Sequence, residues 1–253
     1  MESKTCLNCD SLTNGKYCSN CGQKTNTHRI TFQHFVFHDI MHGVFHFEKG
    51  MLFTAKQALL RPGKAVLDYI HGKRVNYYNI FYFILLLIGI NLFLGLYYDV
   101  LEKKFFEEHL KERAFNEAGM RINEVLNTYT KVMILAVVPL FGIKSYILFR
   151  RKKLNLTEHF LISGILLLGS ALIYTLLNAL SFLGFAFDIE NLKIYLVYFC
   201  FPIISLGYVL YGYYNAFHKD YNIWEISLRL ILLVLLVLFE LYSIIFFVST
   251  LFV

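Results

Sequence analysis

Residues 34–79 read HFVFHDIMHGVFHFEKGMLFTAKQALLRPGKAVLDYIHGKRVNYYN, and the chain is organised around this stretch. A short cysteine-rich segment precedes it, and long apolar stretches follow it. We interpret residues 28–78 as a connector of amphipathic helices that lies at the cytoplasmic face of a membrane. It links a metal-binding module, residues 1–27, to a transmembrane domain, residues 79–253.

Composition points to a membrane protein. The chain is 57% hydrophobic and only 17% charged, and its mean hydropathy is +0.52. This balance is typical of membrane proteins rather than of soluble domains. Five apolar stretches each approach the ~20 residues that a helix needs to cross a bilayer. They are residues 79–98, 130–149, 159–183, 192–217 and 226–252. The sequence therefore predicts an all-α polytopic membrane protein with five transmembrane helices, and Pro139 and Pro202 are expected to kink two of them.

The charges between the apolar stretches indicate an orientation. Loops that remain in the cytoplasm carry an excess of Lys and Arg. Basic residues precede the first stretch and follow the second, whereas the loop after the first stretch is net acidic. We therefore expect a multi-pass protein of a bacterial inner membrane, with its N-terminus in the cytoplasm and its C-terminus outside. The first residues are polar, so no cleavable signal peptide is expected.

The N-terminal module contains two paired cysteine motifs. Cys6 and Cys9 enclose two residues, and so do Cys18 and Cys21. Thiolates at this spacing can share one tetrahedral ion, so the sequence predicts a ribbon with a structural zinc site, with rubredoxin-like iron as the alternative. Four cysteine ligands close the coordination shell, which favours a folding role over catalysis. The local charge is mixed, which indicates a cytoplasmic protein partner rather than nucleic acid.

An amphipathic helix is predicted for residues 30–47, with polar residues on one face and apolar residues on the other. The polar face carries His34, His38, Asp39, His42 and His46. Two imidazoles four residues apart can reach one ion, so these residues are candidate catalytic ligands of a second metal. The competing interpretation is a polar face near the lipid headgroups that binds no metal, and we favour it because most histidines bind none.

Two further sets of polar residues are candidates for a function in the membrane. The first set is basic and precedes the first apolar stretch: Arg61, Lys64, Lys73 and Arg74. These residues could hold lipid phosphates, although the positive-inside rule explains them without a specific lipid. The second set is intramembrane: Glu240, with Asn91 and Asn178 as its candidate hydrogen-bond partners. Glu240 could handle protons or substrate, or it could join helices. Lys144 is expected to snorkel towards the cytoplasmic edge.

The order of these features resembles a bacterial family of integral membrane proteins known as a domain of unknown function. Its members combine an N-terminal zinc ribbon, a His/Asp amphipathic segment and several membrane spans. The matching residues are Cys6, Cys9, Cys18 and Cys21; His38-Asp39, His42 and His46; Arg61-Pro62-Gly63-Lys64; Tyr69; Gly72-Lys73-Arg74; and Tyr77-Tyr78-Asn79. Ile80 stands where the resemblance implies a proline. The layout is also loosely similar to eukaryotic zinc-ribbon membrane proteins of lipid homeostasis, a likeness of architecture only.

Three functions are compatible with the sequence. We favour a non-enzymatic membrane scaffold or lipid-homeostasis factor whose ribbon docks a partner. The first alternative is a metal-dependent membrane enzyme that acts on lipid through the histidines of residues 34–46. The second alternative is a transporter that uses Glu240. The sequence contains no Walker loop, Gly-x-Ser-x-Gly elbow or His-Glu-x-x-His motif, so it indicates no particular reaction.

Overall fold

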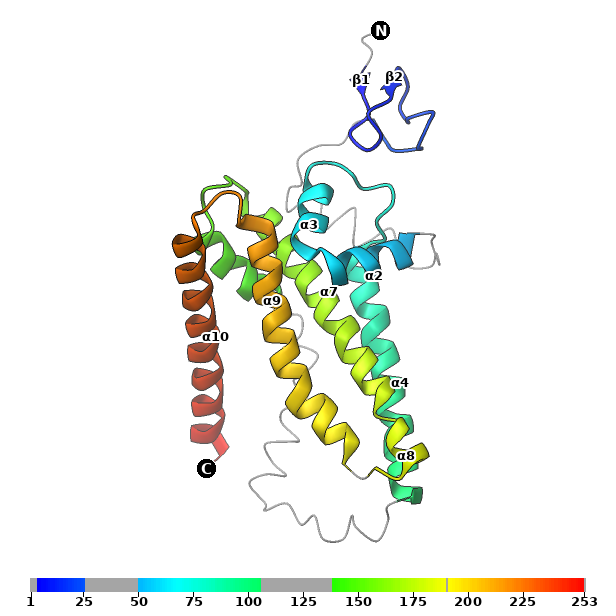
Figure 1. Ribbon diagram of the computed structural model, residues 1–253, viewed down its shortest axis with the longest axis vertical. Helices are drawn as coiled ribbons and strands as arrows, with labels where there is room; N and C mark the ends of the chain where they lie inside the picture. Colours follow the sequence, from blue (N-terminus) through cyan, green and yellow to red (C-terminus); the bar gives the residue numbers. More distant parts are fainter. Residues whose placement is uncertain (1–3, 26–49, 106–137, 190, 253) are drawn as a thin grey trace.

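The computed structural model describes residues 4–25, 50–105, 138–189 and 191–252. A small two-stranded module, residues 4–25, which we call the ribbon, stands at one end of a helical body. The C-terminus lies towards the other end (Figure 1). The elements are β1 (Lys4–Thr5), β2 (Leu12–Thr13), α2 (Gly50–Leu60), α3 (Pro62–Ile70), α4 (Ile80–Phe105), α7 (Leu156–Leu180), α8 (Leu183–Phe187), the π-helix η2 (Ile194–Cys200), α9 (Phe201–Phe217) and α10 (Ile223–Phe252). A further apolar helix, Val138–Leu148, precedes α7.

Three helices are long and apolar enough to cross a bilayer: Ile80–Phe105, Leu156–Phe187 and Ile194–Phe217. They coincide with three of the five predicted spans, and they make the chain compatible with a multi-pass membrane protein. The predicted span 130–149 is described only from residue 138, where the shorter helix begins. The predicted span 226–252 lies within α10. The total of five spans stays a prediction.

The start of α7 differs from the predicted boundary at residue 159. The helix begins at Leu156, because Asn155 and Glu158 form a capping box. The Asn155 side-chain oxygen accepts from the Glu158 amide at 2.8 Å, and the Glu158 carboxylate accepts from the Asn155 amide at 2.7 Å. Two amides that would lack helical partners are thereby satisfied. Residues 156–158 therefore belong to α7.

Pro202 changes the helix in front of it. Proline has no amide hydrogen, and its ring crowds the carbonyl four residues earlier. The chain responds with the π-helix η2, which ends at Cys200, and α9 then begins with Pro202 in its first turn. The expected disturbance of this helix thus takes the form of a wider turn.

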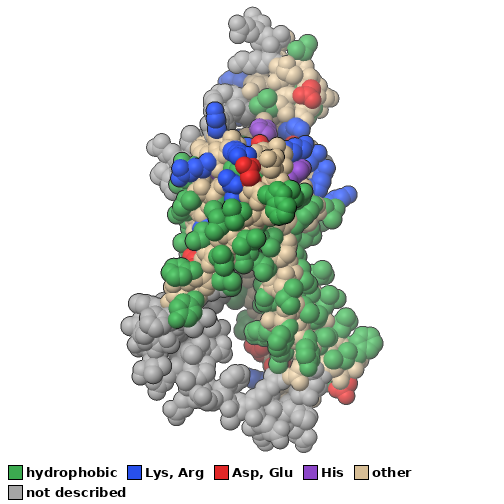
Figure 2. Space-filling model, turned by 60° about the vertical axis from the view of Figure 1, so that its left-hand side comes forward, with side chains coloured by type: hydrophobic (Ala, Val, Ile, Leu, Met, Phe, Trp, Pro, Cys, Tyr) green, Lys and Arg blue, Asp and Glu red, His purple; other side chains and the backbone are tan. Residues whose placement is uncertain are grey.

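A buried aromatic stack lies at the end of the body nearest the ribbon. Two of its rings belong to α9 and the third follows the Val138–Leu148 helix, with Phe149 4.5 Å from Phe217 and 5.5 Å from Tyr213 between ring centroids, and all three side chains are fully buried. The short helices α2 and α3 cover this core by packing on α7 and α9 (Figure 1). On the face shown in Figure 2, apolar side chains cover the surface of the helices, and Lys and Arg side chains gather near the ribbon.

Candidate metal centre and its docking turn

The ribbon consists of two cysteine knuckles on short antiparallel pairings. β1 pairs with β2, and Tyr17 bridges to Lys24. In the first knuckle the Asp10 amide donates to the Cys6 carbonyl, and in the second the Gly22 amide donates to the Cys18 carbonyl, each at 2.9 Å. Asp10 and Gly22 both have left-handed backbones, with φ of 58° and 74°. The two Cys-x-x-Cys motifs therefore fold into equivalent turns that aim their sulfurs inward.

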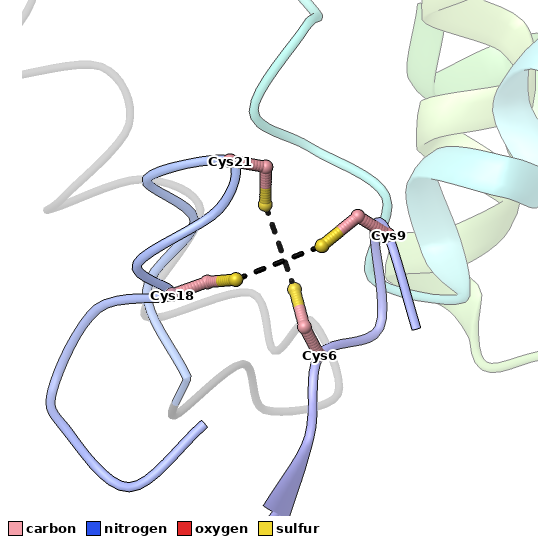
Figure 3. Close-up of side chains that lie close together, drawn as sticks. All are labelled: Cys6, Cys9, Cys18 and Cys21. Carbon is pink, nitrogen blue, oxygen red and sulfur yellow. Dashed lines mark hydrogen bonds between the residues drawn. The ribbon is translucent and has the colours of Figure 1, made fainter. Parts of the chain in front are cut away.

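The four cysteines form a tetrahedral set of donors. The sulfurs of Cys6, Cys9, Cys18 and Cys21 all lie within 4.8 Å of one another and point to a common centre (Figure 3). Cys6 and Cys21 are 3.6 Å apart between sulfurs, as are Cys9 and Cys18. A tetrahedral zinc with bonds of about 2.3 Å requires sulfurs about 3.8 Å apart, so the set fits such an ion. Within the described residues this is the one cluster of His, Cys, Asp or Glu with that geometry.

A bound cation would favour the ionisation of these four thiols. Hydrogen bonds to the side chain and backbone of Ser11 lower the pKa of Cys9 to about 6. A backbone hydrogen bond to Gln23 lowers the pKa of Cys21, but burial and the neighbouring thiols of Cys9 and Cys6 outweigh it and raise that pKa to about 11. One sulfur ionises readily, and its ionisation opposes that of the next. A bound divalent metal would offset the repulsion and keep four thiolates together.

A second feature joins the ribbon to the helical body. Gln23 is only 4% exposed, although its side chain is polar. Its amide nitrogen donates to the Gly72 carbonyl at 2.6 Å. Its side-chain oxygen accepts from the amides of Arg74 at 3.1 Å and Val75 at 3.4 Å. One buried side chain thus holds the backbone of residues 71–75, which we call the docking turn.

The docking turn follows α3, which ends at Ile70, and Gly72 shapes the turn. Gly72 has φ of +101°, a conformation that favours glycine. The Lys73 amide closes the helix end by donating to the Asp68 carbonyl at 3.0 Å. A Cβ on Gly72 would lie 2.7 Å from Leu7 of the ribbon. Glycine therefore serves both the backbone turn and the close approach of the ribbon.

The segment Arg61-Pro62-Gly63-Lys64, which we call the corner, joins α2 to α3. Pro62 occupies the first turn of α3. Helix ends leave carbonyls and amides without helical partners, and α9 supplies partners at this corner. Tyr208 donates to the Ala58 carbonyl at 2.7 Å, and Tyr211 donates to the Leu60 carbonyl at 3.1 Å. The Lys64 amide donates to the Asn215 side-chain oxygen at 2.9 Å.

The structure places the four basic headgroup candidates around the corner and the docking turn, near the ribbon end. Arg61 donates to the Gln57 side chain at 3.0 Å, and Lys64 is exposed. Lys73 lies 3.4 Å from Asp68, and Arg74 donates to the Tyr69 carbonyl at 3.1 Å. Arg61, Lys73 and Arg74 therefore each have a partner within the chain. Binding of lipid phosphate by the four residues stays a prediction.

The intramembrane polar residues pair differently from our expectation. Asn91 of α4 donates to Thr175 at 2.7 Å and accepts from Asn178 at 3.2 Å, so the two asparagines bond each other across α4 and α7. Glu240 of α10 instead forms an ion pair with Lys144. The expectations that the asparagines serve Glu240 and that Lys144 snorkels are wrong. A pairing with the asparagines would require Glu240 to face α4 or α7. In the structure Glu240 instead contacts Lys144 of the Val138–Leu148 helix.

Sequence reasoning also missed a buried polar cluster at the core. His159 is fully buried, with its Nδ1 2.7 Å from the Ser145 hydroxyl. Ser163 lies between it and Tyr213, 3.5 Å from the Tyr213 hydroxyl. No periodicity in the sequence brings these helices together. The histidine ladder His34, His38, His42 and His46, with Asp39, lies outside the described residues.

Taken together, the apolar helices and the cysteine set are compatible with a helical, multi-pass membrane protein that has a candidate metal site at one end. Comparison with known proteins adds one family. Residues 48–90 match the family described as a protein of unknown function, DUF3667. This segment contains α2, the corner, α3, the docking turn and the first part of α4, and the match agrees with the resemblance to an uncharacterised family. No curated protein and no solved structure matches the chain.

Proposed function

We propose that this protein is a multi-pass scaffold or lipid-homeostasis factor of the bacterial inner membrane, whose zinc-loaded ribbon docks a cytoplasmic protein partner. The observation that carries the proposal is the closed set of four sulfurs on a ribbon that is fixed to the helical body. Four protein ligands leave no open position for a substrate, so the metal would act structurally. A rigid, metal-stabilised module at the membrane surface suits docking better than chemistry.

The outer surface of the ribbon supports a protein partner. Leu12 is 71% exposed and Tyr17 is 63% exposed. Neither residue lies in a helix that could cross a membrane, so contact with lipid tails does not explain their exposure. Exposed apolar side chains mark a contact site when they lie together in one patch with a polar rim. We propose that these two residues meet the partner. Arg61 and Lys64 belong to the corner, at the opposite end of α3 from the docking turn. These two residues would face the phosphates of membrane lipids.

The Lys144–Glu240 pair supports a structural role for Glu240 rather than a transport role. A carboxylate that handles protons in a membrane must change its charge during the cycle. Intramembrane acids and bases commonly pair with one another, and Glu240 has such a partner in Lys144. The pair instead joins the Val138–Leu148 helix to α10.

Site-specific photocrosslinking in living cells tests the docking surface. A photoreactive residue would replace Leu12 or Tyr17, and the control would replace Leu96, which is 70% exposed on α4. We expect one discrete protein adduct from both ribbon positions and none of that size from the control. We also expect Cys6→Ser/Cys9→Ser to abolish the adduct, because the ribbon needs its metal. Absence of a ribbon-specific adduct, or an adduct that survives loss of the cysteines, would contradict the proposal.

A further inference from the structure

We infer that Gln23 couples metal occupancy of the ribbon to the docking turn, so that metal binding determines whether the ribbon is held against the membrane body. The inference rests on the metal-loaded ribbon of the proposed function and adds a regulatory role to it. In the described part of the chain, Gln23 makes hydrogen bonds to the docking turn, and Leu7 lies close to Gly72. Both residues belong to the metal knuckles.

The knuckles fix the direction of both side chains. Leu7 lies between two ligands, Cys6 and Cys9. Gln23 follows Cys21 and the left-handed Gly22, and its carbonyl accepts from the Cys18 amide at 2.8 Å. The backbone that carries Gln23 is therefore part of the turn that presents two sulfurs. A metal that closes this turn also aims the Gln23 amide at the docking turn.

The ribbon has little besides metal to hold its shape. Its named strands are only two residues long each, and a sheet of that size is not stable alone in water. Small modules of this kind fold when the metal binds and unfold when it leaves. Loss of the metal should therefore release the knuckles and, with them, Gln23 and Leu7.

Release of Gln23 would remove hydrogen bonds from the docking turn. With Gln23 withdrawn, the Gly72 carbonyl and the amides of Arg74 and Val75 lose the partners that the structure shows. The Lys73 amide keeps its partner, because the Asp68 carbonyl belongs to α3. The same turn contains Lys73 and Arg74, so metal occupancy would also set how firmly two basic side chains are placed near the membrane surface.

Residue-resolved hydrogen exchange on the full-length protein in detergent tests the coupling. The samples are the zinc-loaded parent, the parent after chelation, Gln23→Ala, and the control Asn20→Ala. Asn20 donates an exposed hydrogen bond to Ser11 within the ribbon, rather than to the docking turn. Zinc content is measured for each sample alongside the exchange rates.

We expect chelation and Gln23→Ala each to raise the exchange rates of the Arg74 and Val75 amides by about fivefold, since a hydrogen bond contributes roughly 1 kcal/mol. The Lys73 amide and the Asn20→Ala protein should match the parent, and Gln23→Ala should keep its zinc. Unchanged Arg74 and Val75 amides in Gln23→Ala that retains zinc would overturn the coupling alone. A parent that binds no metal would overturn both the coupling and the proposed function.

Discussion

Replacement of Gly63 by alanine should separate α3 from α9. A Cβ at Gly63 would lie 2.2 Å from the Ala216 amide nitrogen and 2.6 Å from the Gly212 carbonyl oxygen. Both contacts are with backbone atoms, which cannot rotate away, so a helix must move. Gly207→Ala is the matched control, because a Cβ there meets nothing within 4 Å.

The magnitude follows from two costs and one gain. Overpacking of a close contact costs about 1–3 kcal/mol. A shift of α3 also weakens the Lys64–Asn215 hydrogen bond at the corner, which contributes about 1 kcal/mol. Alanine returns at most about 1 kcal/mol of helix propensity. The net loss of unfolding free energy should therefore be about 1–3 kcal/mol, whereas Gly207→Ala should gain up to about 1 kcal/mol.

Thermal unfolding of the purified protein in detergent measures both changes. For a chain of this size, 1 kcal/mol corresponds to about 2–4 °C in Tm. Gly63→Ala should therefore unfold several degrees below the parent, and Gly207→Ala at or slightly above it. A Gly63→Ala protein as stable as Gly207→Ala would refute the close packing of the corner on α9.

Two further predictions concern charge pairs. Lys144→Ala or Glu240→Gln should lower Tm. Breaking a buried pair typically costs about 3–5 kcal/mol, and this pair should cost less because it is partly exposed. Lys144→Glu combined with Glu240→Lys should recover part of the loss in Tm, and a double variant no more stable than the single variants would contradict the pairing. At the edge of the predicted fifth span, a hydrogen bond from Arg151 lowers the pKa of Glu225. The pair's contribution should be present above the pKa of an unfolded glutamate, about 4.3, and should disappear as the pH falls through the lower folded pKa. Glu225→Gln should remove this part of the pH dependence of Tm, and an unchanged acid-side profile would show that the pair does not form.

Local chemistry was predictable from the sequence. The cysteine spacing located the candidate metal site, since ligands in one knuckle are close along the chain. Pro62 at the start of α3 and Gly72 after its end were also predictable, because helix ends depend on backbone properties of single residues. The apolar stretches revealed three helices that can cross a membrane.

Pairings between distant segments were not predictable. Asn91 meets Asn178, and Lys144 meets Glu240, because of which helix faces turn towards each other. Hydropathy gives the length of an apolar helix but not its neighbours. Gln23 was missed for the same reason, since a single polar residue after a knuckle has no pattern until the docking turn lies against it.

The most direct test of the scaffold account is the metal content per chain of detergent-purified protein. The parent would be compared with Cys6→Ser/Cys9→Ser and with His38→Ala/His42→Ala, the second pair belonging to the histidine ladder. The account predicts one zinc per chain, which is lost in the cysteine variant and kept in the histidine variant. An additional metal that disappears only in the histidine variant would contradict the account and favour a metal-dependent enzyme.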